Sequence, residues 1–363
     1  MRYLITGGLG FLGVNLAKHL METDDHAEIV IVDPAASRLP VLARFVDPGR
    51  IAVDTVSGIT LPEGILGARI RELGRSLAPG RVEVHLSRMR QLSDYTFLGG
   101  WLPDRVYHLA SHASPVMYRN HPIDTLHTGA IDTMQALSLI RHDRGRMLLA
   151  STSEVYGDPD VSPQPETYRG RVSPIGPRSM YDESKRFAEA LVAAHVDAGQ
   201  DCRIARIFNT YGPGMARGDG RLIPALLTAC EEGRPLPIHG TGHQTRSLCY
   251  VDDTIRGIVA LMESDSPHLI QREGSRRQVQ PVNIGNPDER PVRLIAERAG
   301  LAWAGITGSP PPGVDWIPNP CPDDPTNRRP DIARARSWLG WEPSVDLDEG
   351  LRLTVEDWIA ARS

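Results

Sequence analysis

The first 33 residues read MRYLITGGLGFLGVNLAKHLMETDDHAEIVIVD, and this stretch decides the fold. Residues 2–6 are apolar and β-favouring, residues 7–13 are rich in glycine, and residues 14–21 have the apolar spacing of a helix. Residues 28–33, Glu-Ile-Val-Ile-Val-Asp, form a second apolar run that ends on an acid. This order of strand, glycine turn, helix and strand predicts a βαβ unit that opens a parallel sheet.

The glycines in this turn satisfy two overlapping patterns, Gly8-x-Gly10-x-x-Gly13 and Gly7-x-x-Gly10-x-x-Gly13. Glycine lets the chain turn tightly and lets backbone N–H groups approach a pyrophosphate at the helix N-terminus. Asp33 follows at the end of the next strand, where an acid accepts hydrogen bonds from ribose hydroxyls and favours NAD over NADP. The pattern therefore predicts a site for NAD.

The rest of the chain predicts a two-part α/β fold. Short apolar runs over 105–110, 147–151 and 202–207 alternate with helical patterns over 122–141 and 181–198, which is typical of a doubly wound parallel sheet with helices on both faces. After about residue 210 glycine, proline and arginine become more frequent and the strands shorten. We expect an NAD-binding Rossmann domain over 1–207. A smaller C-terminal α/β substrate-binding domain is expected over 208–363, with some segments returning to the first domain.

Composition excludes several classes of protein. The chain has 363 residues and a formal net charge of −5, which argues against nucleic acid as its main partner. No apolar run reaches the roughly 18 residues of a membrane span, and the N-terminus has no signal-peptide pattern. The four cysteines lie far apart and match no metal spacing. These features predict a cytoplasmic protein with reduced thiols and without a metal or a membrane partner.

The segment Tyr181-Asp182-Glu183-Ser184-Lys185 carries a second pattern. Residues four apart on a helix share one face, so the phenol and the ammonium lie together. Lysine occurs only at Lys18 and Lys185, and every other basic residue except histidine is arginine, which draws attention to Lys185. A nearby ammonium favours the phenolate of Tyr181, which can then accept a proton from a substrate hydroxyl.

A third cluster, Thr152-Ser153-Glu154, ends the apolar run over 147–151. Ligands bind at the carboxyl ends of strands in this kind of sheet. Thr152 and Ser153 offer hydroxyls to a sugar and Glu154 offers an acid or a base. A cluster that only caps the turn is the alternative interpretation.

With these motifs the sequence resembles the extended short-chain dehydrogenase/reductase family of nucleotide-sugar enzymes, and within it the UDP-glucuronate decarboxylases. The resemblance covers residues 1–33 and 103–350. Beyond the glycine turn and the Tyr-x-x-x-Lys pair, it rests on 148–159, 174–177, 206–213, 219–221, 244–246, 282–287, 323–332 and 339–343.

The resemblance implies NAD-dependent oxidation at sugar C4, loss of CO₂ from the 4-keto sugar and re-reduction at C4. Tyr181 is the implied base with Lys185 as its partner, Thr152 positions the sugar, Ser153 and Glu154 lie near C5, and Arg328 takes part in decarboxylation. The implied cofactor contacts are Gly7, Gly10, Phe11, Leu12, Gly13, Asp33, Leu109, Ala110, Ser111, Thr128, Tyr181 and Lys185. The implied substrate contacts are Asn209, Arg221, Gln244, Arg246, His127 and Arg328. The family also implies a homodimer formed through a helix bundle.

Three residues depart from the family pattern. Gly214 replaces an arginine, and His127-Thr128-Gly129 stands where the family shows Lys-Thr-Asn, so His127 is the candidate substitute for a lysine at the glucuronate carboxylate. The product is UDP-xylose or the 4-keto pentose. A hexose 4,6-dehydratase, a UDP-glucuronate 4-epimerase and an NAD-sensing regulatory protein are the alternatives, although Ser153 stands where the dehydratases have an acidic residue.

Overall fold

The computed structural model of the chain describes residues 1–47, 50–54, 69–70, 80–92, 101–140, 144–318 and 327–361. At its centre is a nine-stranded sheet in the order β15-β8-β7-β6-β1-β2-β5-β3-β4, in which each strand pairs in parallel with its neighbours. The strands are β1 (Arg2–Thr6), β2 (Glu28–Val32), β3 (Ile51–Asp54), β4 (Arg69–Ile70), β5 (Arg81–His85), β6 (Arg105–His108), β7 (Arg146–Thr152), β8 (Asp201–Ile207) and β15 (Val282–Ile284).

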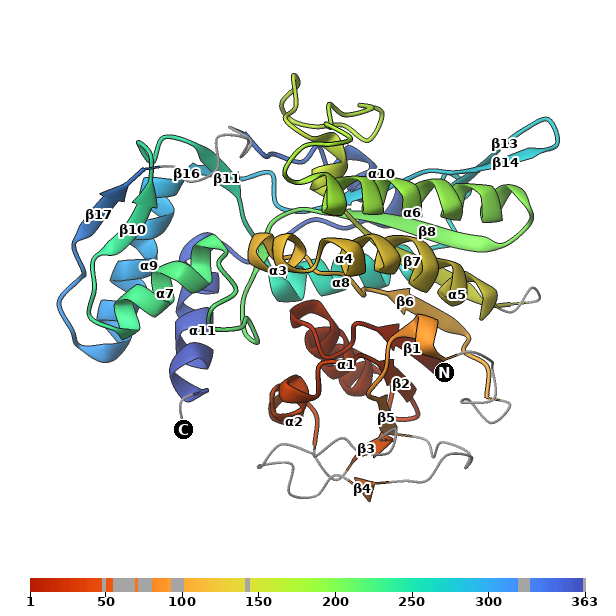
Figure 1. Cartoon of the computed structure of the whole chain (residues 1–363), viewed down its shortest axis with the longest axis horizontal. Coiled ribbons are helices and arrows are strands. Elements are labelled where there is room, and N and C mark those ends of the chain that lie inside the picture. Colours follow the sequence, from red (N-terminus) through yellow and green to blue (C-terminus); the bar gives the residue numbers. More distant parts are fainter. Residues whose placement is uncertain are drawn as a thin grey trace.

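Helices cover both faces of this sheet, because the buried side chains of a strand alternate between its two sides. In β1, Ile5 joins a core with helices α1 (Phe11–Thr23) and α8 (Val251–Glu263), whereas Leu4 joins a core with α5 (Thr133–Ser138) and α6 (Ser179–Asp197). Figure 1 shows the two helical layers on either side of the strands. The predicted α/β fold, doubly wound on a parallel sheet, is confirmed.

A smaller group of elements, at the left of Figure 1, packs against the first core. It contains helices α7, α9 and α11 and a parallel pair of strands, β10 and β17. The bounds are β10 (Leu236–His239), β11 (Thr245–Ser247), β16 (Glu289–Pro291), β17 (Val314–Ile317), α7 (Leu222–Glu231), α9 (Val292–Thr307) and α11 (Leu347–Ala360).

The remaining elements are short or connect these layers. They are η1 (Ala36–Arg38), α2 (Leu39–Phe45), η3 (Met89–Gln91), α3 (Pro115–Asn120), α4 (Pro122–His127), η5 (Thr128–Asp132), η6 (Ser153–Tyr156), β9 (Thr210–Tyr211), β12 (Cys249–Tyr250), β13 (Ile270–Glu273), β14 (Arg276–Val279) and α10 (Ala333–Leu339).

Two segments from beyond residue 207 lie with the large sheet. Strand β15 extends the sheet by pairing with β8, and α8 packs over β7 and β8. The first half of the chain therefore depends on residues from the second half. The division into domains at residue 207 stays a prediction.

The helix expected over 122–141 is divided into α4, a single π-turn (η5) and α5. At the π-turn the backbone comes very close to α6, since a Cβ on Gly129 would lie 2.6 Å from both Cβ and the carbonyl oxygen of Ser184. Glycine at this position therefore allows the two helical segments to touch.

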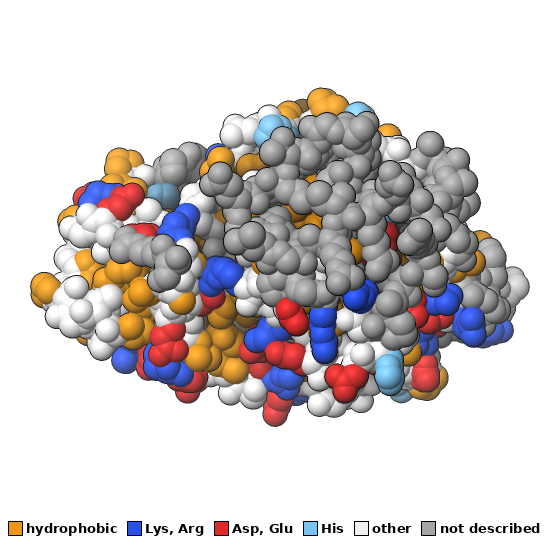
Figure 2. All heavy atoms as spheres, turned by 90° about the horizontal axis from the view of Figure 1, so that it is seen from below, with side chains coloured by type: hydrophobic (Ala, Val, Ile, Leu, Met, Phe, Trp, Pro, Cys, Tyr) orange, Lys and Arg blue, Asp and Glu red, His pale blue; other side chains and the backbone are white. Residues whose placement is uncertain are grey.

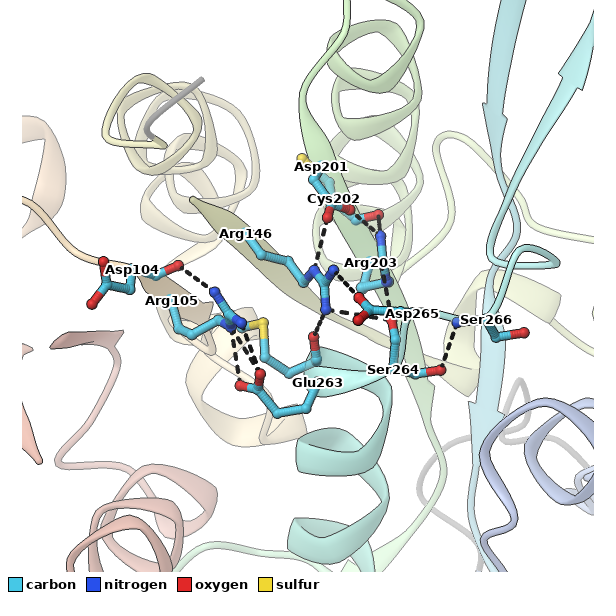
Figure 3. Close-up of polar contacts among 11 residues, drawn as sticks. Asp104, Arg105, Arg146, Asp201, Cys202, Arg203, Glu263, Ser264, Asp265 and Ser266 are labelled. Atoms are coloured by element: carbon cyan, nitrogen blue, oxygen red, sulfur yellow. Dashed lines mark hydrogen bonds and ion pairs between the residues drawn. The ribbon is translucent and has the colours of Figure 1, made fainter. Parts of the chain in front are cut away.

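At the amino ends of β6, β7 and β8, arginines join the strands to the end of α8 (Figure 3). Arg146 Nε donates to Asp201 Oδ2 at 2.8 Å, and its Nη1 donates to the Met262 carbonyl at 2.6 Å. Arg203 also pairs with Asp201, and Arg105 pairs with Glu263. This edge of the sheet is thus tied by ion pairs, whereas the glycine turn lies at the opposite, carboxyl edge.

Acidic and basic side chains lie interspersed on the face shown in Figure 2, as the small net charge of −5 leads one to expect. Among the described residues, no helix has both the length and the apolar character needed to span a bilayer. No group of three or more potential metal ligands gathers within the same described part of the chain.

Candidate active site

The glycine turn between β1 and α1 has the shape that a dinucleotide requires. Gly7 has a φ of +70°, and a Cβ there would lie 2.7 Å from Ala110 Cα, so glycine is needed for both conformation and space. A Cβ on Gly13 would lie 2.5 Å from Gly8 Cα. Helix α1 begins after Gly10 with no side-chain cap, which leaves backbone donors at its N-terminus for a ligand.

Asp33 lies next to this turn and is buried. Its Oδ2 accepts from the Leu9 N–H at 3.1 Å and its Oδ1 accepts from the Ala35 N–H at 2.8 Å. Burial raises the pKa of Asp33, and these two hydrogen bonds and the charge of Arg38 oppose that rise. The carboxyl group is thus fixed beside the turn, where the ribose of NAD would lie. The turn and Asp33 together fit the cofactor that the sequence predicts.

A cavity of about 920 Å³ opens at the carboxyl ends of the central strands, between them and the elements of the second half. This is the size range of small-molecule sites. Most of the residues expected at the site line this cavity: Phe11, Leu12, Leu109, Ser111, Thr152, Ser153, Glu154, Tyr181, Lys185, Asn209, Arg221, Gln244, Arg246 and Arg328.

Tyr181 and Lys185 project from α6 into the cavity. Lys185 Nζ donates to the Ala150 carbonyl at 2.8 Å, which anchors the ammonium to the end of β7. Burial lowers the pKa of Lys185 to about 8, although the charge of Glu189 opposes the change. Burial raises the pKa of Tyr181, whereas a hydrogen bond with Thr152 lowers it. In the protein alone the phenol is therefore protonated, and Thr152 is positioned to share its proton.

Glu154 is held between two arginines. Arg328 Nη2 donates to Glu154 Oε2 at 3.0 Å, and Arg178 donates to the same oxygen. Burial alone would raise the pKa of Glu154, but Arg328, Arg178 and Arg246 together hold it below its usual value. Glu154 is therefore a carboxylate at neutral pH and does not store a proton there.

Arg328 is fully engaged by the strand-end turn. Besides Glu154, its Nη1 donates to the carbonyls of Ser153 at 2.9 Å and Gly157 at 3.0 Å. Its side chain is only 2% exposed. This arginine therefore fixes the backbone around Ser153 and the carboxylate of Glu154 at the same time.

The second half of the chain supplies the far wall of the cavity. Arg221 pairs with Asp219, and its guanidinium lies 5.9 Å from the centre of the Phe11 ring. Gln244 Nε2 donates to the His239 carbonyl at 2.8 Å, and Arg246 Nη1 donates to the Thr245 carbonyl at 2.7 Å. The far wall thus offers two arginines to a charged ligand such as a diphosphate.

Seven of the predicted contacts do not line the cavity. Gly7, Gly10 and Gly13 belong to the glycine turn described above, Asp33 lies beside it, and Ala110 packs against Gly7. The other two are His127 and Thr128.

His127 lies exposed on α4 and is not among the residues that line the cavity, so its contact with the sugar carboxylate stays a prediction. Thr128 is buried, but its hydroxyl donates to the Asp124 carbonyl at 2.9 Å. Thr125 of α4 and Thr128 of η5 are three residues apart and lie on the buried side of the helix. His127 lies on the side that faces solvent.

Among the residues at or beside the cavity that the sequence did not indicate are Tyr118 from α3, Arg178 just before α6 and Asp182 in the first turn of α6. Tyr118 and Arg178 line the cavity, and Asp182 is buried beside them. Arg178 precedes Tyr181 by three residues, so helical spacing could have indicated Arg178, whereas Asp182 directly follows Tyr181 and points away from it. Tyr118 comes from a distant segment that carries no comparable signal.

Comparison with known proteins agrees with this geometry. The sequence model described as the NAD dependent epimerase/dehydratase family matches residues 3–272. UDP-glucuronic acid decarboxylase 3 of Arabidopsis thaliana is 38% identical over 99% of this chain and 89% of its own length. UDP-glucuronic acid decarboxylase 1 of Xenopus tropicalis is 44% identical over 69% of this chain and 56% of its own length.

Among solved structures, an epimerase from Methanothermobacter thermautotrophicus superposes with a TM-score of 0.75 at 24% identity, covering 99% of this chain and 93% of its own. This structural similarity supports the α/β fold described above. The sequence match spans the glycine turn, Asp33 and the Tyr181–Lys185 pair, and runs through most of both halves of the sheet. The chain therefore belongs to the NAD-dependent epimerase/dehydratase family.

Proposed function

We propose that this chain decarboxylates UDP-glucuronate, with NAD as its bound cofactor, to give UDP-xylose or the 4-keto pentose. Relatives that share 38% identity over 99% of the chain are named UDP-glucuronic acid decarboxylases. The structural observation that carries the proposal is the Arg178–Glu154–Arg328 group, which shares one cavity with Tyr181 and Lys185. The Tyr181–Lys185 pair, which would move the hydroxyl proton, and the charged group thus line the same cavity.

The first step belongs to Tyr181, which is protonated in the protein alone and becomes a phenolate under the positive charges of Lys185 and of bound NAD⁺. As a phenolate it accepts the proton of the C4 hydroxyl. When bound at the glycine turn and Asp33, NAD supplies the two-electron oxidation at C4 and its reversal at the end. Lys185, held by the Ala150 carbonyl, favours the phenolate through its charge. Thr152 orients the phenol through its hydrogen bond.

The new ketone at C4 is β to the C6 carboxylate, so the C5–C6 bond can break with release of CO₂. The electron pair moves to the C4 oxygen as an enolate, which Tyr181 and Thr152 stabilise as hydrogen-bond donors. Protonation at C5 gives the 4-keto pentose, and re-reduction at C4, with the proton returned from Tyr181, gives UDP-xylose. Because Glu154 is held ionised, it is suited to orient the water or hydroxyl that delivers this proton.

The test is purified protein with UDP-glucuronate and NAD, with CO₂ and products followed by mass. We expect CO₂ and a pentose or 4-keto pentose product from the parent, and neither from Tyr181→Phe, which removes the proton acceptor but little volume. A product that keeps its carboxylate would indicate a 4-epimerase. Loss of water from a nucleotide hexose would indicate a dehydratase, and NAD binding without turnover would indicate a sensor.

We also propose that the chain forms a homodimer through α3, α4, η5, α5 and α6. Large apolar side chains are exposed along these helices: Val116, Met117, Ile123, Leu126, Ile131, Met134 and Phe187. Exposed apolar side chains gathered on one face favour association with a second copy of the same face. A cytoplasmic location stays a prediction.

A further inference from the structure

Glu189 lies on α6, four residues after Lys185, and takes no part in the steps described above. Its side chain is only 14% exposed, so the helix carries a carboxylate into the interior beside the sheet. Removing a charge from water is costly unless the charge is paired and hydrogen-bonded. The partners of Glu189 therefore indicate what this carboxylate does.

Arg206 of β8 and Ser151 of β7 hold the carboxylate in place. Arg206 Nη2 donates to Glu189 Oε2 at 2.8 Å, and Arg206 Nε donates to Glu189 Oε1 at 3.0 Å, which is the two-bond arrangement of a guanidinium and a carboxylate. Ser151 Oγ donates to the same Oε1 at 2.5 Å. The position of the carboxylate is thus fixed from two neighbouring strands of the sheet.

Lys185 precedes Glu189 by one helical turn, on the same face of α6. Residues four apart on a helix have Cβ atoms about 5–6 Å apart. Lys185 Nζ donates to the carbonyl of Ala150 at 2.8 Å, and Glu189 accepts from the next residue of β7, Ser151. The ammonium and the carboxylate therefore lie against consecutive residues of one strand, and each is close enough to act on the other through its charge.

Glu189 is the group that opposes the effect of burial on Lys185. Burial lowers the pKa of Lys185 to about 8, and the charge of Glu189 acts in the opposite direction. His108 of β6 also lies near Lys185, but burial and the charge of Lys185 lower the pKa of His108 to about 3, so this ring is neutral.

The other elements packed on α6 carry ionisable groups that have partners of their own. Glu154 of η6 pairs with Arg328, Asp124 of α4 and Asp132 of η5 pair with Arg90, and Arg276 of β14 pairs with Asp197. Tyr118 of α3 is an uncharged phenol, because burial raises its pKa to about 12. The charge that stabilises the buried ammonium is therefore that of Glu189.

We propose that Glu189 is a positioning residue of the catalytic pair, and that its carboxylate keeps Lys185 an ammonium so that Tyr181 can act as a phenolate. This inference rests on the proposed function, in which Tyr181 accepts the proton of the C4 hydroxyl. Glu189 is not among the residues that line the cavity, so it acts on the reaction through Lys185 and not by contact with the sugar.

The alternative is a carboxylate that only ties the helix to the sheet. The two roles are separated by comparing Glu189→Gln with Arg206→Met. Both substitutions break the same ion pair, but the first removes the negative charge and the second leaves it in place. A purely structural role predicts similar effects of the two substitutions on Lys185, whereas the proposed role predicts an effect of Glu189→Gln alone.

The test measures the ionisation of Lys185 directly, which is practical because Lys18 is the only other lysine in the chain. The NAD-loaded proteins carry lysine labelled with carbon-13 at Cε, whose NMR shift reports the protonation of Nζ. They are titrated below their melting temperatures. Lys18, whose side chain is 40% exposed, is the internal reference, and Lys18→Arg assigns the two signals.

Asp197→Asn is the matched control. Asp197 is another carboxylate of α6 that pairs with an arginine, Arg276. It lies twelve residues after Lys185, which is about 18 Å along the helix axis. Its loss removes a charge and an ion pair from the same helix at a distance from the catalytic pair.

We expect the pKa of Lys185 to fall by about 1 or more in Glu189→Gln, because a nearby opposite charge shifts a pKa by about 1–3. Arg206→Met should not lower the pKa of Lys185, and Asp197→Asn should leave it unchanged. An unchanged pKa of Lys185 in Glu189→Gln, or an equal fall in either of the other two variants, would overturn the proposal.

The dependence of the reaction on pH connects this charge to catalysis. A lysine with a lower pKa loses its proton at a lower pH, so in Glu189→Gln the rate of C4 oxidation, followed as NADH absorbance in a single turnover, should decline at a lower pH than in the parent. A rate that falls by the same factor at every pH would count against the proposal. A parent that does not oxidise UDP-glucuronate would overturn the proposed function alone, because the titration of Lys185 needs no substrate.

Discussion

Glu154 has a proposed role at the substrate and also neutralises two arginines, and the two roles can be separated. In Glu154→Gln the buried Arg328 loses its charged partner, so we expect a loss of about 3 kcal/mol in the free energy of unfolding. We also expect CO₂ release to fall at least about a hundredfold, while oxidation at C4, seen as NADH absorbance, remains detectable at temperatures below melting.

Asp201→Asn is the control for this variant, because Asp201 is likewise shared by two arginines, Arg146 and Arg203, at the opposite edge of the sheet (Figure 3). It should lose stability but keep the parent's CO₂ release. If Glu154→Gln kept that rate as well, the carboxylate would serve only to hold the turn after β7.

Asp182 makes stability depend on pH in a direction that can be worked out. Burial, followed by the charge of Glu154, raises the pKa of Asp182 to about 7 from 3.8. Between these values the folded protein holds a proton that the unfolded chain has released, so this group's contribution to stability falls as pH rises from about 4 to 7. Asp182→Asn stays neutral and lacks this loss.

We therefore expect the melting temperature of Asp182→Asn, relative to the parent, to increase steadily between pH 5 and pH 7. The underlying free-energy difference should change by about 1.4 kcal/mol per pH unit. A constant difference for Asp182→Asn would mean that this carboxyl is ionised throughout that range.

At the scale of elements, the contact between η5 and α6 depends on a missing side chain. A Cβ on Gly129 would meet Ser184 at 2.6 Å, both at its Cβ and at its carbonyl oxygen, and the carbonyl cannot rotate away. Gly129→Ala should therefore destabilise the protein by about 2 kcal/mol and move Tyr181 and Lys185, which lie on the same helix. Circular dichroism melting and CO₂ release would measure the two effects.

Gly305→Ala provides the comparison for this substitution. Gly305 is also helical, within α9, and a Cβ there would meet nothing within 4 Å. Alanine should stabilise that helix by about 0.5–1 kcal/mol without affecting catalysis. If Gly129→Ala lowers the stability of the protein while Gly305→Ala raises it, the loss at Gly129 comes from the contact with Ser184 and not from helix propensity.

The elements that the sequence predicts well are those with local signals. The glycine turn, the run that ends at Asp33 and the Tyr181–Lys185 spacing each lie within a single unit of structure. Strands β3 and β5 lie within 34–100, where the sequence shows only weak periodicity, and they were not predicted. Strand β15, only three residues long, is recognisable only by its pairing with β8.

At the site, the residues that the sequence missed are those that tertiary contacts bring in. Tyr118 lies more than sixty residues before Tyr181, and only the packing of α3 on α6 stacks the two rings. The exposure of His127 could not be predicted, because a position in a motif does not specify which way a helix turns a side chain. Much of the least readable segment, 34–100, lies outside the described residues.

At the scale of the whole molecule, the apolar face on α3 to α6 predicts the oligomeric state. Ile123 on α4 and Met134 on α5 are 63% and 53% exposed. Replacing both with glutamate should convert a dimer into a monomer, because the charges would lose water on association. Light scattering coupled to size exclusion measures the mass directly.

Two exposed apolar residues in the second half serve as controls for this experiment. Leu301→Glu and Trp316→Glu place the same charge on α9 and β17, away from the proposed interface. They should leave the mass unchanged. A parent that elutes as a monomer, or a glutamate pair that still dimerises, would contradict the assignment of this face.

The pairing of β15 with β8 has a consequence for synthesis on the ribosome. Strand β8 ends at Ile207, and the residues that cover its outer edge begin only at Val282. While the intervening segment is being translated, the backbone N–H and C=O groups on the outer edge of β8, the side away from β7, have no neighbouring strand, and such an edge readily pairs with another nascent chain. A ribosome that stalls between these two points would therefore expose an aggregation-prone sheet, and slow codons in this interval should lower the yield of folded protein more than slow codons placed after Ile284.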